Sequence, residues 1–362
     1  MRQRYLGLGI ALALLTSGAL GYVLVGMHLY DRYHLAYANY RFADTGPCGA
    51  LIAWSPPHVI YTGLYVNAPD LVSLRYRSPA PQVLRISMSI PELTQQQTVQ
   101  VEAEPAFQTQ AFKPPLLSSA ALDALVSPGQ RQAQIQLHVQ SAANTICDTT
   151  APVLLKSRWW MHWYDPATGT DYAPYLAGWV TPHATAIISL IGQTAAWMRQ
   201  HPGSYPGTAG LIGYDGGRAS QQDVQNQVDA LFDTLQQVDH VAYAQDNVPY
   251  SQDAEQIIKL PQDVLASPYP SAMCVETTAI LASAIEALGM RPYFIIVPGH
   301  AFLGVALGAD QTATLGYWET SDLNGTSGAS ANHDGNTKYD PSQVLRVIDV
   351  QYERNQGIEP IE

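Results

Sequence analysis

The run MCVETTAILASAIEALG, residues 273–289, predicts an α-helix that begins at a cysteine. Leu281 and Ile285 lie on one stripe of this helix, and Gly289 occupies a position where helices commonly end. A thiol at a helix N-terminus feels the partial positive charge of backbone N–H groups without an acceptor, which favours the thiolate. The same N–H groups are suited to donate to an oxyanion. The run therefore makes Cys274 a candidate for an activated thiol, although a single cysteine before a helix is more often a core residue.

Two strands are expected directly after this helix. Residues 293–297 are rich in β-branched and aromatic side chains, and a Pro-Gly turn separates them from a second strand that begins at His300. The chain returns over residues 313–320, so the edge of an antiparallel hairpin would present His300 beside Glu319. A thiolate nucleophile, an imidazole that moves protons and a carboxylate that fixes the imidazole tautomer form a catalytic triad.

Three short motifs follow one another in this half of the chain: Met273-Cys274-Val275-Glu276, Pro298-Gly299-His300-Ala301-Phe302-Leu303-Gly304 and Glu319-Thr320. Their order and spacing resemble the bacterial transglutaminase-like superfamily, within the broader papain-like group, over about residues 220–362. Residues 256–265 resemble the family's approach to the cysteine helix, and residues 344–350 with 357–360 resemble its C-terminal end. The resemblance implies an α+β cysteine domain with Cys274 as nucleophile, His300 as general base and acid, and Glu319 as orienting carboxylate.

The chain departs from the more usual family pattern at two positions. Met273 stands where the family has glycine before the cysteine, and Glu319 stands where it has aspartate. Asp322 is therefore an alternative third member of the triad.

The remaining polar groups near the cysteine are open to more than one interpretation. Glu276 lies two residues after Cys274, on another face of the helix, so we expect a structural or substrate-facing role. Gln256 is a possible oxyanion donor, and the alternatives to it are Gln252, Tyr243 and Tyr250.

The N-terminal 27 residues predict a membrane anchor. Arg2 and Arg4 precede a segment from Tyr5 to Met27 that has no charged side chain, about the length that crosses a bilayer core of roughly 30 Å. Basic residues before the segment favour a cytoplasmic N-terminus, one membrane pass and extracytoplasmic C-terminal domains. A cleaved signal peptide is the alternative, but its apolar region is usually shorter. Residues 28–50 are interpreted as a stalk.

The chain has three cysteines, Cys48, Cys147 and Cys274. Thiols pair in the oxidising compartment that an exported chain enters, and one of three must stay unpaired. Cys48 and Cys147 flank a single β-rich segment, so a disulfide between them would leave Cys274 free. The alternative is that the first two are buried, inert thiols.

The period of the apolar residues divides the chain. Strict alternation over residues 72–76, 84–90, 99–103 and 133–139 predicts half-buried strands, and thus an antiparallel β-sandwich-like domain over residues 51–158. Helical spacing from Thr181-Pro182 to about His201, and again after Ser220, predicts helices in a transglutaminase-like domain over residues 159–362. The aromatic run 159–164 is expected to pack between domains, with a binding platform as the alternative.

Composition limits the function. The formal net charge of −12, with no basic cluster after the N-terminus, argues against a nucleic-acid partner. The acidic segment 327–340 lacks the order of a calcium loop and is interpreted as a solvated loop, and neither a zinc pattern nor a cofactor motif is present. We expect a bacterial, extracytoplasmic cysteine protease, amidase or acyltransferase acting on peptide or protein substrates, with a catalytically silent cell-envelope adaptor as the alternative.

Overall fold

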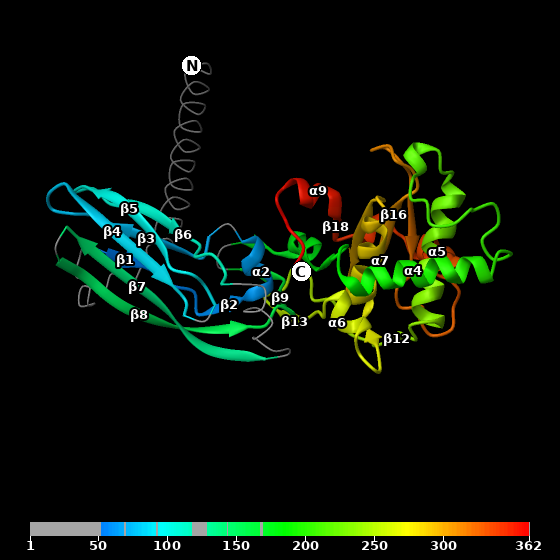
Figure 1. The fold of residues 1–362 in the computed structure, drawn as a ribbon, viewed down its shortest axis with the longest axis horizontal. Helices are drawn as coiled ribbons and strands as arrows, with labels where there is room; N and C mark the ends of the chain where they lie inside the picture. Colours follow the sequence, from blue (N-terminus) through cyan, green and yellow to red (C-terminus); the bar gives the residue numbers. More distant parts are fainter. Residues whose placement is uncertain are drawn as a thin grey trace, which may run out of the picture. The chain divides into compact units, whose positions relative to one another are not determined.

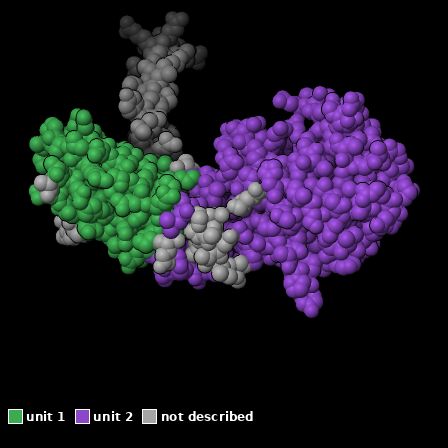
Figure 2. All heavy atoms as spheres, in the orientation of Figure 1, with its two compact units in different colours: residues 1–58, 70–115, 134–153 green, residues 59–69, 116–133, 154–362 purple. Residues whose placement is uncertain are grey.

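The computed structural model describes two compact units (Figure 2). The described residues are 52–68, 70–91, 93–117, 129–142, 144–166 and 169–361. The expected anchor, the stalk and Cys48 lie outside them. Within these ranges no helix is both long enough and apolar enough to cross a membrane.

The first unit takes its described residues from 52–58, 70–115 and 134–153, and it is built from β-strands. One antiparallel sheet has the order β1 (Ile52–Trp54), β3 (Val72–Tyr76), β6 (Gln108–Phe112). In the other sheet the neighbours are β5 (Gln97–Ala103), β4 (Gln82–Ser89), β7 (Gln130–Ser141) and β8 (Asn144–Lys156) (Figure 1). All four alternating runs of the sequence lie in these strands.

Alternation predicts these strands because successive side chains point to opposite faces of a sheet. In β4, Leu84, Ile86 and Met88 are almost completely buried. Their neighbours Val83 and Arg85 are exposed. On β8, Cys147 is buried and disulfide-bonded. Cys274 is a free thiol, as the pairing scheme requires.

The second unit, residues 59–69, 116–133 and 154–362, combines helices with a four-stranded sheet, so the chain as a whole is α+β. The sheet order is β17 (Leu315–Trp318), β16 (His300–Ala306), β15 (Pro292–Val297), β18 (Arg346–Asp349), and all its pairs are antiparallel. Helix α7 (Cys274–Ala287) packs on β15 and β16 (Figure 1). Nearly every residue of α7 is buried, which makes it the central helix of this unit.

Three further long helices belong to the second unit: α4 (Thr185–Gln200), α5 (Gln221–Gln237) and α8 (Gly328–Lys338). Ser220 and Asp223 cap the start of α5 reciprocally, as helix-start chemistry predicts. The predicted start of α4 at Thr181-Pro182 is wrong, because the helix begins at Thr185 and the Thr181 hydroxyl donates to Gln262.

The prediction of a solvated loop over residues 327–340 is also wrong. Ser327 caps α8 by accepting a hydrogen bond from the backbone N–H of Ser330. Gly335 lies so close to β17 that a Cβ atom there would be 2.6 Å from the Tyr317 carbonyl oxygen. The helix therefore forms because it packs on the sheet edge, although its residues are poor helix formers.

The remaining elements of the second unit are short. They are β2 (Val59–Tyr61), α2 (Thr62–Asn67), β9 (Trp160–His162), β10 (Tyr164–Asp165), β11 (Thr170–Asp171), η2 (Ala173–Trp179), η3 (Asp215–Gly217), β12 (Ala242–Tyr243), β13 (Glu255–Ile257), α6 (Pro261–Leu265), β14 (Ser271–Ala272), η4 (Pro341–Gln343) and α9 (Val350–Asn355). The aromatic run of the sequence packs inside this unit: Met161 and Trp163 are fully buried, and β9 pairs with β13.

Candidate active site

Cys274 is the first residue of α7, and its side chain is fully buried. The residue before it, Met273, is the N-cap. The Glu276 carboxylate accepts the backbone N–H of Met273 at 3.0 Å and that of Lys259 at 2.7 Å. Glu276 therefore holds the start of the helix, which is the structural one of the two roles expected for it. The backbone N–H of Cys274 is among the first N–H groups of the helix, which have no intrahelical acceptor.

His300 begins β16 at the tight connection between β15 and β16. It pairs with Val297 in the register of the two strands. Gly299 adopts a φ of +72°, and a Cβ at this position would overlap the Asn247 side chain. The turn therefore needs glycine for both its backbone conformation and its close neighbour. This turn fixes the position of the His300 backbone at the start of β16.

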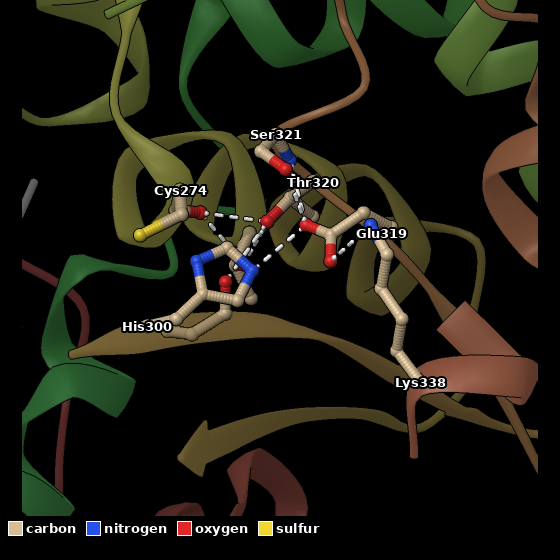
Figure 3. Close-up of polar contacts among 8 residues, drawn as sticks. Cys274, His300, Glu319, Thr320, Ser321 and Lys338 are labelled. Atoms are coloured by element: carbon tan, nitrogen blue, oxygen red, sulfur yellow. Dashed lines mark hydrogen bonds and ion pairs between the residues drawn. The ribbon is translucent and has the colours of Figure 1, made fainter. Parts of the chain in front are cut away.

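Glu319 follows β17 directly and reaches the imidazole. His300 Nε2 and Glu319 Oε1 are 2.7 Å apart. Figure 3 shows the other ring nitrogen of His300 on the side where Cys274 Sγ lies. The side chains of Cys274, His300 and Glu319 thus lie in the order that a cysteine triad requires.

The ionisation of His300 and Glu319 matches this arrangement. Burial lowers the pKa of His300, but its hydrogen bonds to Cys274 and Glu319 and their negative charges outweigh burial and raise the pKa to about 9. Burial raises the pKa of Glu319, but the hydrogen bond and positive charge of His300, together with the hydrogen bonds of Ser321, lower it to about 2. At neutral pH the pair is therefore an imidazolium and a carboxylate.

Glu319 is only 3% exposed and is held by three further hydrogen bonds besides that to His300. The backbone N–H and the hydroxyl of Ser321 donate to Oε1 at 3.0 and 2.7 Å. Lys338 Nζ, from the last turn of α8, lies 3.2 Å from Oε2 (Figure 3). A buried carboxylate with this many donors is fixed in place and stays ionised.

Two threonine hydroxyls connect α7, which begins at Cys274, to β16, which begins at His300. Thr320 Oγ1 lies 3.1 Å from the carbonyl oxygen of Cys274 and 3.0 Å from that of Ala301, the neighbour of His300. Thr278 Oγ1 lies 2.8 Å from the Cys274 carbonyl and 3.3 Å from Thr320 Oγ1. Each hydroxyl has one hydrogen to donate, so the pair shares these acceptors while holding α7 against β16.

Asp322, the alternative third member, makes no hydrogen bond to His300. Its Oδ2 atom is buried and has no hydrogen-bond partner among the described residues. Burial raises the pKa of Asp322. The structure therefore brings Glu319, and not Asp322, to the imidazole.

The candidate oxyanion donors differ in the acceptors that they already have within the protein. Gln256 is buried next to the start of α7, with its Nε2 near Asp246 Oδ2 (3.0 Å), the Asn247 carbonyl (3.2 Å) and Met273 Sδ (3.2 Å). Both amide hydrogens of Gln256 thus have protein acceptors. Tyr250 donates to Asp171 at 3.2 Å.

Tyr243 also lies near the candidate triad. Burial raises its pKa to about 12, with further contributions from the charges of Cys274, Glu319 and Asp246. Gln252 is exposed. We therefore place the backbone N–H of Cys274 first among the candidate oxyanion donors, because the Gln256 amide hydrogens already have acceptors within the protein.

Sequence reasoning assigned no role to Thr278, Thr320, Ser321 or Lys338, although Thr320 belongs to one of the quoted motifs. The first three could have been found, because they lie four residues after Cys274 and directly after Glu319. Lys338 carries no such signal, since it lies in the segment interpreted as a loop. Among the described residues no cluster of three or more His, Cys, Asp or Glu is suited to hold a metal ion.

Comparisons with known proteins add no relative to this picture. No protein-family model, no curated protein and no solved structure matches the chain. The residues and distances of the site are therefore what supports a function.

Proposed function

We propose that the second unit is a transglutaminase-like cysteine domain that transfers or hydrolyses acyl groups of peptide or protein substrates, with Cys274, His300 and Glu319 as its triad. We further propose that this unit acts outside the cytoplasm, in a chain that is anchored by its N-terminal segment and that also contains a sandwich-like β-domain. The observation that carries the proposal is the 2.7 Å contact between His300 and Glu319, with the second imidazole nitrogen turned to the cysteine.

The reaction begins from the thiolate and imidazolium. The Cys274 sulfur attacks the substrate carbonyl carbon, a C–S bond forms, and the carbonyl electrons move to oxygen, where the N-terminal N–H groups of α7 stabilise the negative charge. His300 gives its proton to the leaving amine as the C–N bond breaks, which leaves a thioester and a neutral imidazole. Glu319 keeps the ring orientation and stabilises its protonated form.

The second half of the reaction resolves the thioester. Water or an amine attacks the acyl carbon while His300 accepts its proton, and the C–S bond breaks to return the thiolate. Water gives hydrolysis and an amine gives transfer. The imidazolium is restored in either case. The cycle therefore needs no redox partner, and the catalytic residues gain or lose no proton overall.

The proposal is tested by labelling the nucleophile with an electrophile that forms a stable thioether with it. The purified full-length chain is treated with a peptidyl acyloxymethyl ketone, an electrophile that requires an activated thiolate, and the modified peptide is identified by mass spectrometry. We expect one adduct, at Cys274, and none in Cys274→Ala. Rapid, stoichiometric labelling that is unchanged in His300→Ala would contradict a triad.

A second candidate is a catalytically silent cell-envelope adaptor that retains the domain as a scaffold. The observation that favours it is the complete burial of Cys274. The adaptor predicts no adduct with the peptidyl electrophile and full biological activity of Cys274→Ala, whereas the enzyme predicts loss of that activity.

A further inference from the structure

A cavity of about 560 Å³ opens beside the start of α7. Its lining includes Met273 and Glu276, which flank Cys274 in the sequence, and the segment from Ala244 to Asn247, which follows Tyr243. Met273 and Gln256 meet in its wall, since the Gln256 amide lies 3.2 Å from the Met273 sulfur. The cavity is therefore placed to receive the part of a substrate that extends from the acyl group at Cys274.

The walls of the cavity are partly apolar. They include Trp160, Pro249 and Ile257 together with the Met273 side chain. Surfaces of this kind suit the methylene stem of a long side chain, whose polar end then reaches a charged group or water. The charged groups of the cavity determine whether a positively or a negatively charged side-chain end is favoured.

Two of the three carboxylates in the lining already have cationic partners. Glu255 forms an ion pair with Lys156 and accepts the hydroxyl hydrogen of Tyr61. Glu276 lies 3.6 Å from Lys259 Nζ and is fully buried. These two pairs are neutral overall, so neither leaves a charge for a ligand.

Asp246 is the third carboxylate, and its charge is not neutralised within the protein. It accepts the backbone N–H of Asn247 and the amide of Gln256, and it makes no ion pair with another described residue. It is exposed at the cavity. Three carboxylates against two ammonium groups leave one negative charge, in a chain whose formal net charge is −12.

We propose that this cavity is a substrate subsite for a long cationic side chain, lysine or arginine in type, with its methylene stem on the apolar wall and its charged end on Asp246. The subsite rests on the proposed function, because it names the substrate class of the same thiol. It gives the enzyme a preference for basic peptides.

The test compares matched electrophiles rather than unknown substrates. Short peptidyl acyloxymethyl ketones carry lysine, norleucine or glutamate at one position and are otherwise identical, and the variable position is moved along the peptide in turn. The rate of Cys274 labelling in the full-length chain is read by mass spectrometry. We expect lysine to exceed norleucine by about fivefold at one position, glutamate to be slowest, and the preference to fall as salt is added.

Variants of Asp246 assign the preference to its source. Asp246→Asn should reduce the ratio of lysine to norleucine rates to about one, and Asp246→Lys should favour glutamate. The ratio within each variant cancels any change that reaches the thiol through Gln256. Asp310→Asn, which removes one exposed charge from the loop between β16 and β17, is the matched control and should keep the parent ratio.

The outcomes separate the subsite from the chemistry. Equal labelling by lysine and norleucine probes at every position, or a preference that survives in Asp246→Asn, overturns the subsite while Cys274 remains a reactive thiol. Absence of labelling by every probe overturns the proposed function, and the subsite with it.

Discussion

Two buried glutamates of the second unit lie in or close to the candidate triad, and their environments shift their pKa values in opposite directions. Glu319, after β17, contacts an imidazole, and its pKa is lowered to about 2. Glu276, in the first turn of α7, accepts two backbone N–H groups, and burial raises its pKa despite Lys259. The same type of side chain thus pairs with an imidazole in one region and caps a helix in the other. What differs is the titratable ring: Glu319 contacts the His300 imidazole in addition to its other donors, whereas Glu276 has backbone amides and Lys259 as partners.

The largest effect should come from Glu319→Gln. The amide keeps the shape but removes the negative charge that stabilises the imidazolium, so Cys274 labelling by the peptidyl electrophile should slow by about 10²- to 10⁴-fold. Kinetics of labelling measure this, with circular dichroism to verify the fold. A decrease equal to that of Glu276→Gln would remove the distinction between the two regions.

Glu276→Gln should instead act on stability. The variant weakens two hydrogen bonds from buried backbone donors to a carboxylate, which we expect to cost about 1–3 kcal/mol in the free energy of unfolding. Urea denaturation of parent and variant measures the difference. A normal unfolding midpoint combined with lost labelling would contradict the capping role.

The sequence revealed the parts of the site that depend on local pattern. Helical spacing placed Cys274 at a helix start, and β-branched and aromatic residues followed by a Pro-Gly turn placed His300 on a hairpin. The sequence did not predict the contact between Lys338 and Glu319. Lys338 lies in α8, and the Gly, Asn and Asp residues of this segment are typical of a loop. That helix exists through packing on β17, and packing between distant segments has no periodic signal in one chain.

The ion pair should make stability depend on pH in a defined window. The pKa of His300 rises from 6.5 to about 9, so its contribution is complete below about 6.5 and is lost as pH rises through 9. The pKa of Glu319 falls from 4.5 to about 2, so its contribution is complete above about 4.5 and is lost as pH falls through 2.

The difference in unfolding midpoint between the parent and Glu319→Gln reports this window. We expect it to be largest between about pH 4.5 and 6.5 and to shrink toward pH 9. A difference that does not vary with pH would mean that His300 and Glu319 are not an ion pair in solution.

Thr320→Val should have a smaller effect. The change removes the hydroxyl shared by the Cys274 and Ala301 carbonyls, at an expected cost of about 1 kcal/mol in unfolding free energy. If Thr320 positions the thiol, labelling at saturating probe should slow while the probe's half-saturating concentration stays unchanged. Thr320→Ser, which restores the hydroxyl, should recover the rate, and failure of that rescue would leave only a packing role.

Lys338→Met should have the smallest effect. The lysine side chain is 53% exposed, and exposed ion pairs contribute at most about 1 kcal/mol. Labelling should slow by no more than about fivefold, mainly at low salt. A loss as large as that of Glu319→Gln would make Lys338 a required member of the site.

The most direct test of the account is the pH dependence of Cys274 alkylation by iodoacetamide in the full-length chain, compared between the parent and His300→Ala. The account predicts fast alkylation of the parent already at pH 6, and slow alkylation of His300→Ala at pH 6 that recovers only as pH rises past the range of an ordinary thiol, about 8.5. Identical profiles for the two proteins, or a thiol that does not react in either, would contradict an activated Cys274–His300 pair.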